Sequence, residues 1–63
     1  MKELKELKRL KRERAISYEV MARDIGVSMR TLWRWLKDES SPSLMAVEKI
    51  RIYLSADGGG KSE

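Results

Sequence analysis

Two arginines four residues apart, Arg30 and Arg34, lie within one predicted helix, with Met29 beside the first of them. A guanidinium group can donate two hydrogen bonds to O6 and N7 of guanine, and a methionine can contact the methyl group of thymine. These residue types at this spacing therefore suit contact with base edges in duplex DNA. Two alternatives remain open: Arg30 meets only phosphate, and Met29 packs under the preceding helix. For Arg34, base and phosphate contacts are both open.

Four neighbouring side chains suit contacts to the DNA backbone, which position a protein without carrying sequence information: Tyr18, Ser28, Thr31 and Lys37. Ser28 also has a simpler role as the N-cap of the helix. Trp35, three residues after Leu32, is predicted to lie in the core. Trp33 points elsewhere, and three roles are open for it: covering the loop after this helix, touching DNA sugars or meeting a second subunit.

Catalytic and metal chemistry lack the residues that they need. The chain has no cysteine and no histidine, so thiolate nucleophiles and the usual zinc ligands are missing. The run 58–61 (GGGK) lacks the spacing and the preceding strand of a phosphate-binding loop. We therefore expect no enzyme, no cofactor and no small-molecule ligand. The formal net charge of +4 favours an anionic partner, although charge alone is weak evidence.

The elements that must position these residues are two short helices that meet at a corner. Ser17 is a suitable N-cap for a helix that ends near Asp24, and Ala22 leaves room for a second helix to approach. Gly26 supplies the backbone freedom that a left-handed turn residue needs. The second helix is predicted over residues 28–37. The pattern is that of a helix-turn-helix within the apolar frame formed by Val20, Met21, Ile25, Val27, Leu32 and Trp35.

Two outer helices complete the expected domain. Residues 2–14 carry leucines at helical spacing, and the rest of the segment consists of good helix formers. This helix lacks the Trp or Phe of a membrane-surface helix, so we expect Arg9 and Arg12 to lie on a solvated face. Residues 38–43 are predicted to form a loop, in which Pro42 prevents a helix from continuing. After it, Ser43 caps a fourth helix, whose predicted apolar face comprises Leu44, Val47, Ile50 and Leu54.

The sequence thus predicts an all-α, compact four-helix domain over residues 1–55 and a flexible Gly- and Ser-rich tail over residues 56–63. No apolar run approaches the roughly 20 residues that a membrane-spanning helix requires. No secretory signal pattern is present at the first residues. We therefore expect a cytoplasmic protein.

The segment 18–37 resembles the Cro/repressor (XRE-type) DNA-binding family, and the resemblance extends over about residues 7–54. The matching positions are Leu10-Lys11, Ile16-Ser17, Ala22, Gly26, Val27-Ser28, Leu32, Arg34-Trp35, Pro42-Ser43-Leu44, Ile50 and Leu54. The resemblance implies a lambda-repressor-like fold and sequence-specific binding of double-stranded DNA by a small prokaryotic or phage-type transcriptional regulator. It also implies a homodimer on a pseudo-palindrome. Nothing after Leu54 offers an obvious dimer interface, so we expect dimerisation that is weak or occurs only on DNA.

Two positions depart from the family pattern. The family commonly has Glu after the Trp, paired with an Arg of the first helix, whereas this chain has Leu36 and Lys11. We expect apolar packing to replace that ion pair. The family often has Gln where this chain has Tyr18, whose hydroxyl can still donate to a phosphate.

A second function remains open, namely a protein-interaction module such as an antitoxin or a regulatory subunit with the same fold. Trp33 and Leu36 would form its contact surface. RNA binding is a weaker option, because the aromatic residues do not form the sheet platform that single-strand readers use.

Overall fold

The computed structural model of the chain describes residues 1–58, and every regular element in that range is helical. The elements are α1 (Lys2–Arg14), α2 (Tyr18–Ile25), α3 (Met29–Leu36), α4 (Leu44–Tyr53) and the π-helical turn η1 (Leu54–Gly58). Residues 1–58 contain no strand, which confirms the predicted all-α, four-helix fold.

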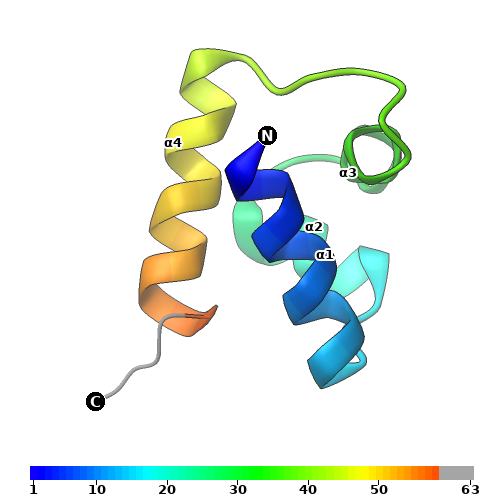
Figure 1. Cartoon of the computed structure of the whole chain (residues 1–63), viewed down its shortest axis with the longest axis vertical. Coiled ribbons are helices and arrows are strands. Elements are labelled where there is room, and N and C mark those ends of the chain that lie inside the picture. The colour runs from blue at the N-terminus through cyan, green and yellow to red at the C-terminus, as the bar shows by residue number, and fades with distance from the viewer. Residues whose placement is uncertain (59–63) are drawn as a thin grey trace.

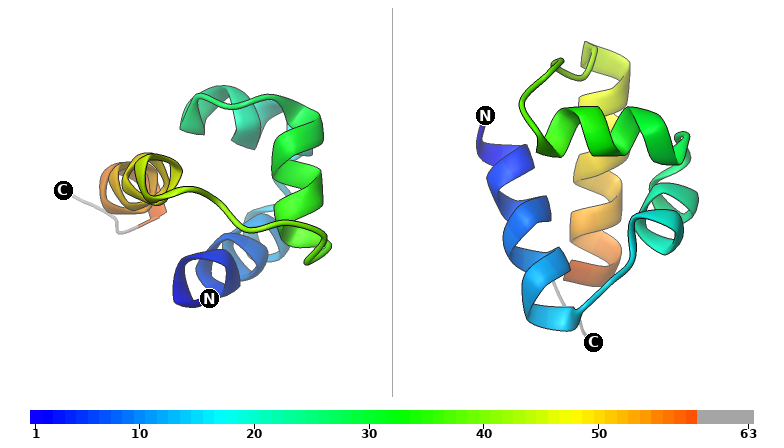
Figure 2. Two further views of the ribbon diagram at one scale, coloured as in Figure 1. Left: turned by 90° about the horizontal axis from the view of Figure 1, so that it is seen from above. Right: turned by 90° about the vertical axis from the view of Figure 1, so that its right-hand side faces the viewer.

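The four α-helices enclose one core, and α3 lies across its upper end. In Figure 1, α1 and α4 run down the molecule and α3 is seen almost along its axis. The views in Figure 2 show that α3 crosses the direction of α1 and α4 steeply, with α2 joined to it by a short corner. The helix α3 packs on α1 and α2, and α4 packs on the same two helices. One side of α3 is therefore held by the domain, and its other side faces outward.

Serine hydroxyl groups begin three of the helices. The Oγ atoms of Ser17, Ser28 and Ser43 each accept a hydrogen bond from the backbone N–H three residues later, at 3.1, 3.1 and 3.2 Å. Each bond satisfies one backbone N–H group that the first turn of a helix leaves without a partner. All three predicted N-caps are thus confirmed.

The corner between α2 and α3 depends on Gly26, which ends α2 in the left-handed conformation at φ 101°. Its N–H and that of Val27 both donate to the carbonyl of Ala22, at 2.8 and 3.0 Å. A Cβ atom placed on Gly26 would meet nothing within 4 Å, so the need for glycine is set by the backbone angle and not by space. The buried Ala22, 2% exposed, lies at the close approach that the sequence predicts.

The core contains the predicted leucines of α1 and the apolar side chains of α2 and α3. Its buried members are Leu4, Leu7, Leu10, Met21, Ala22, Ile25, Leu32, Trp35, Leu36, Ile50 and Tyr53. Burial of Trp35 confirms its predicted place, and burial of Leu36 agrees with the apolar packing expected there. Val20, which the sequence places in the apolar frame, is 38% exposed because α2 directs Met21 and Ile25 inward instead.

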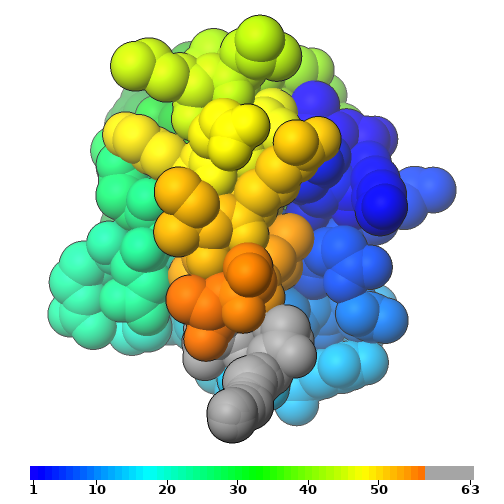
Figure 3. All heavy atoms as spheres, turned by 90° about the vertical axis from the view of Figure 1, so that its left-hand side faces the viewer, coloured from blue at the N-terminus to red at the C-terminus, as the bar shows by residue number. Residues whose placement is uncertain are grey.

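The predicted apolar face of α4 is wrong at its first residue. Leu44 is 87% exposed, whereas Ile50 is fully buried and Tyr53 takes a core position that the sequence analysis does not assign. Steps of three residues each fall about 60° short of a full turn, so Leu44 lies about 120° away from Ile50 around the helix. Met45 and Ile52 are also exposed, by 74% and 65%, on the outer side of α4. This helix forms the middle of the surface in Figure 3, between α1 and the α2–α3 corner.

The helical path passes the predicted domain boundary at residue 55, because η1 continues α4 through Gly58. The rest of the predicted tail, residues 59–63, lies outside the described residues. Within residues 1–58, no helix is long and apolar enough to span a membrane.

Candidate nucleic-acid interface

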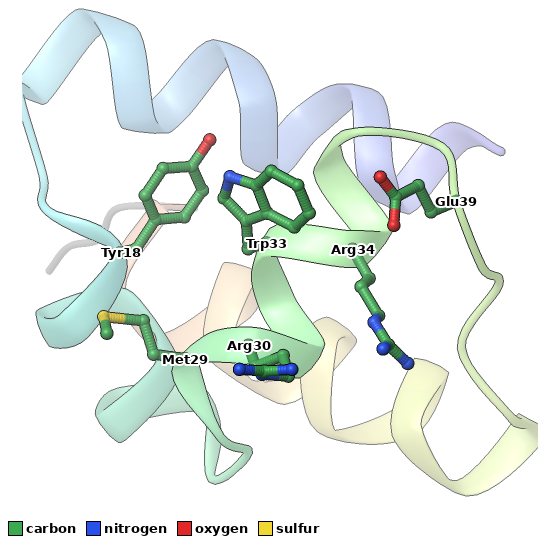
Figure 4. A pocket seen from close by; sticks show the side chains of 6 residues that line it. All are labelled: Tyr18, Met29, Arg30, Trp33, Arg34 and Glu39. Carbon is green, nitrogen blue, oxygen red and sulfur yellow. The ribbon is translucent and has the colours of Figure 1, made fainter.

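The outward side of α3 forms one wall of an open hollow of about 500 Å³, which we name the α3 hollow. It is lined by Tyr18, Met29, Arg30, Trp33, Arg34 and Glu39. In Figure 4, Tyr18 and Met29 lie at one end, Arg34 and Glu39 lie at the other, and Trp33 and Arg30 lie between them. The structure therefore gathers on one surface all three predicted base-contacting residues and one predicted backbone-contacting residue.

The division of α3 into two sides explains this arrangement. Leu32, Trp35 and Leu36 are buried, while Met29 and Trp33 keep 54% and 40% of their surface exposed. The predicted packing of Met29 under α2 is therefore at most partial. Large apolar groups that remain exposed beside charged ones are typical of contact surfaces.

The two arginines of the α3 hollow have no carboxylate partner. Neither Arg30 nor Arg34 forms an ion pair with any of residues 1–58, although Glu39 lines the same hollow. Four other cations of residues 1–58 form ion pairs: Lys8 with Asp38, Arg9 with Glu6, Arg23 with Asp24, and Arg51 with Glu3 and Glu48. Both guanidinium groups thus keep their donors available for an external acceptor.

Lysines flank the two aromatic walls of the hollow. The Nζ atom of Lys11 lies 4.1 Å from the centroid of the Tyr18 ring. The Nζ atom of Lys37 lies 5.9 Å from the ring centroid of Trp33. Both distances are within the range of cation–π attraction, so each lysine favours one position of its ring and adds positive charge near the hollow.

The hydroxyl groups at the start of α3 have different remaining capacity. Ser28 Oγ accepts from the backbone N–H of Thr31 and donates its own hydrogen to Thr31 Oγ1, at 2.8 Å. The hydroxyl hydrogen of Ser28 is then used within the protein, whereas that of Thr31 remains available. Of the two predicted phosphate contacts, Thr31 is the better placed donor.

A comparison with protein families matches residues 5–59 to the family described as "Helix-turn-helix domain". This match covers most of the chain and includes the corner, the α3 hollow, α4 and all of α1 after its first three residues. The chain belongs to the helix-turn-helix domain family. No curated protein and no solved structure matches it. Helix-turn-helix domains place their second helix, here α3, against DNA, and they are typically non-enzymatic.

The other predicted contact residues of this helix-turn-helix domain lie at the two ends of α3. Ser28 and Thr31 are at its N-terminal end, and Lys37 is its C-cap residue. These three residues do not line the α3 hollow, which brings together the other four predicted site residues, namely Tyr18, Met29, Arg30 and Arg34.

Two residues of the α3 hollow have no single role that the sequence predicts. Three roles are open for Trp33, and the sequence pattern assigns none to Glu39. Glu39 reaches the hollow because Asp38 adopts the left-handed conformation at φ 61° and the N–H of Glu39 donates to the carbonyl of Arg34 at 2.9 Å. A positive φ at an aspartate has only a weak sequence signal, so this return of the chain could not be predicted. Among residues 1–58, no cluster of His, Cys, Asp and Glu could hold a metal ion.

Proposed function

We propose that this helix-turn-helix domain binds double-stranded DNA sequence-specifically, as a small prokaryotic or phage-type transcriptional regulator of the Cro/repressor (XRE-type) family. The observation that carries the proposal is the pair of unpaired arginines, Arg30 and Arg34, on the outward side of α3. The major groove of B-DNA is about 12 Å wide and admits one α-helix. Residues 28–37 are proposed to enter it with Met29 and Arg30 leading.

The contacts divide into two groups. Met29, Arg30 and Arg34 are proposed to meet base edges, where guanidinium groups recognise guanine. Tyr18, Ser28, Thr31 and Lys37 are proposed to meet the backbone and to fix the register of α3. The position of Tyr18 at the first residue of α2 and of Lys37 at the end of α3 supports contacts on both sides of the groove.

The proposal places the protein in the cytoplasm, where its partner is duplex DNA. It includes a homodimer that forms on DNA, because two-fold related half-sites would bring two copies together. Residues 1–55 are the proposed DNA-binding unit, which α4 and η1 extend to Gly58. Neither a cofactor nor a small-molecule ligand is part of the proposal.

Selection of bound sequences from a random duplex library tests the proposed function directly. An enriched symmetric motif, bound with an affinity that falls steeply as salt rises, is the expected result. Enrichment of a single asymmetric half-site would retain specific binding but contradict the dimer. Absence of any enriched sequence would overturn sequence-specific DNA binding.

A second candidate function is that of a protein-interaction module. The contact surface predicted for it, Trp33 with Leu36, is not formed, because Leu36 is only 8% exposed. One observation favours this function instead: the apolar side chains of Leu44, Met45 and Ile52 are exposed on α4. A partner protein that binds the domain without any competition from duplex DNA would support this function.

A further inference from the structure

The proposed contacts do not say which group occupies the apolar half of the α3 hollow. This half consists of Tyr18, Met29 and Trp33, which lie beside the two arginines (Figure 4). The Tyr18 hydroxyl and the Trp33 indole N–H can each donate one hydrogen bond, but the Met29 thioether and the faces of the two rings cannot. A group that contacts Met29 and the ring faces must therefore be apolar.

Duplex DNA offers one such group in the major groove. The 5-methyl group of thymine projects there, and 5-methylcytosine carries the same group at the same ring position. The other groups that distinguish the bases in this groove are hydrogen-bond donors or acceptors, and unmethylated cytosine presents only a C–H at the position of the methyl group. An apolar hollow on a groove-facing helix therefore matches a 5-methylpyrimidine by its chemistry.

The charges around the hollow suit hydrogen-bond acceptors, because Arg30 and Arg34 outnumber the one carboxylate, that of Glu39, at the end opposite Met29. Positive charge attracts phosphates and base acceptors alike, so the assignment of a base edge rests on the apolar end at Met29. Arg30 is the next residue after Met29 and lies unpaired at the same surface. A guanine read by Arg30 would therefore neighbour the base that contacts Met29.

Both aromatic walls are held before any ligand arrives. Lys11 lies over Tyr18 at 4.1 Å and Lys37 lies over Trp33 at 5.9 Å. Rings that are already positioned lose little conformational freedom on binding. The hollow is thus preorganised at its two rings and adaptable at the flexible Met29.

We infer that the α3 hollow reads the 5-methyl group of a pyrimidine next to the guanine contacted by Arg30. At that position 5-methylcytosine would therefore be recognised in the same way as thymine, and unmethylated cytosine would not. This inference rests on the proposed function, because it assigns the base that α3 reads. Met29 is the specificity-determining contact, and Tyr18 and Trp33 are the walls around it.

The test uses the duplex selected from the random library, resynthesised with 2′-deoxyuridine in place of one thymine at a time. Burial of one methyl group corresponds to about a fourfold change in affinity. We expect deoxyuridine to weaken binding by about fourfold at one thymine beside a guanine in each half-site. Replacing that base pair by cytosine–guanine and then methylating the cytosine should strengthen binding by a similar factor.

Two methionine variants locate the effect. Met29→Ala should bring the affinities for the thymine and deoxyuridine duplexes to within about 1.5-fold of each other. Met45→Ala removes a more exposed methionine on α4, outside the hollow, and should leave the difference unchanged. Both variants change exposed side chains, and circular dichroism verifies their fold.

Three results would overturn the inference while the domain still selects a DNA sequence. They are a motif without thymine beside guanine, equal affinity for thymine and deoxyuridine at every position, and a difference that persists in Met29→Ala. Failure to select any sequence is a distinct result, because it overturns the proposed function itself.

Discussion

Lys11 of α1 holds its ammonium group 4.1 Å from the centre of the Tyr18 ring at the start of α2. This contact joins the first helix to the surface of the α3 hollow. With Leu36 buried, no carboxylate stands at that position to pair with Lys11, and the lysine contacts an aromatic face. The Tyr18 hydroxyl is left as the polar group that can reach DNA.

Tyr18→Phe tests this division of roles. The ring and its contact with Lys11 are kept, so the free energy of unfolding should change by less than about 0.5 kcal/mol. Loss of the hydroxyl donor should weaken DNA binding by about 0.5–1.5 kcal/mol. Fluorescence anisotropy with the selected duplex measures the affinity, and thermal denaturation measures the stability. Wild-type affinity in Tyr18→Phe would contradict a phosphate contact by the hydroxyl.

Arg30→Ala should cost about 1–3 kcal/mol of binding to the selected duplex and should relax the preference at one base pair. The reason is that Arg30 is the second residue of α3 and forms no ion pair with any of residues 1–58. Arg34 lies one helical turn later, so its guanidinium group would not occupy the same position. Competition with duplexes that carry each base at that position provides the measurement. Lys49→Ala, which removes a charge of the same sign from α4, is the matched control. Equal weakening on all sequences would show that Arg30 contacts phosphate only.

Lys37→Gln should lower the slope of log affinity against log salt by about one unit, because one phosphate contact releases about one counterion. The ring of Trp33, 5.9 Å from Lys37 Nζ, would lose its cation in the same variant. Titrations at several salt concentrations give the slope for the variant and for Lys49→Gln. An unchanged slope for Lys37→Gln would contradict the backbone contact.

The hydroxyl pair at the start of α3 gives two separable outcomes. Ser28→Ala removes an N-cap and should lower the free energy of unfolding by about 1 kcal/mol. The DNA-backbone contact of Ser28 is expected to be the weaker of the two, because the Ser28 hydroxyl already donates to Thr31 Oγ1. Thr31→Val removes the hydroxyl whose hydrogen remains available, and it should weaken DNA binding more than Ser28→Ala does. Urea denaturation and anisotropy measure the two quantities. The reverse order of affinities would assign the phosphate contact to Ser28.

Features set by a few adjacent residues could be predicted from the sequence. The caps at Ser17, Ser28 and Ser43 and the left-handed Gly26 follow from local backbone needs, which act over three or four positions. The leucines of α1 and the burial of Trp35 follow from helical periodicity. These local rules were enough to place α3 and its outward side.

Features set by contacts between distant segments could not be predicted in the same way. Periodicity placed Leu44 on the core side, but only the packing of α4 on α1 and α2 decides which side is buried. The contact of Lys11 with Tyr18 and the return of Glu39 toward Arg34 depend on turns at Ala15 and Asp38, both with positive φ. Neither residue has the strong preference for that conformation that marks Gly26.

Glu3→Gln should make the stability of the domain less sensitive to acid. Arg51 Nε of α4 donates to Glu3 Oε2 of α1 at 3.0 Å. The pKa of Glu3 is lowered, first by a hydrogen bond with its own backbone and next by the hydrogen bond from Arg51. A lowered pKa means that the folded state favours the carboxylate. Its contribution to stability is therefore present above the unfolded pKa of about 4.3 and is lost as the pH falls through the lower folded value.

The wild type should accordingly exceed Glu3→Gln in its unfolding midpoint near neutral pH, and the difference should shrink as the pH falls below about 4. Urea denaturation over a series of pH values measures it. Glu13→Gln removes another carboxylate from α1 without touching Arg51 and is the matched control. A gap between wild type and Glu3→Gln that stayed constant across this range would mean that side-chain packing, and not the charge of Glu3, joins α1 to α4 at this point.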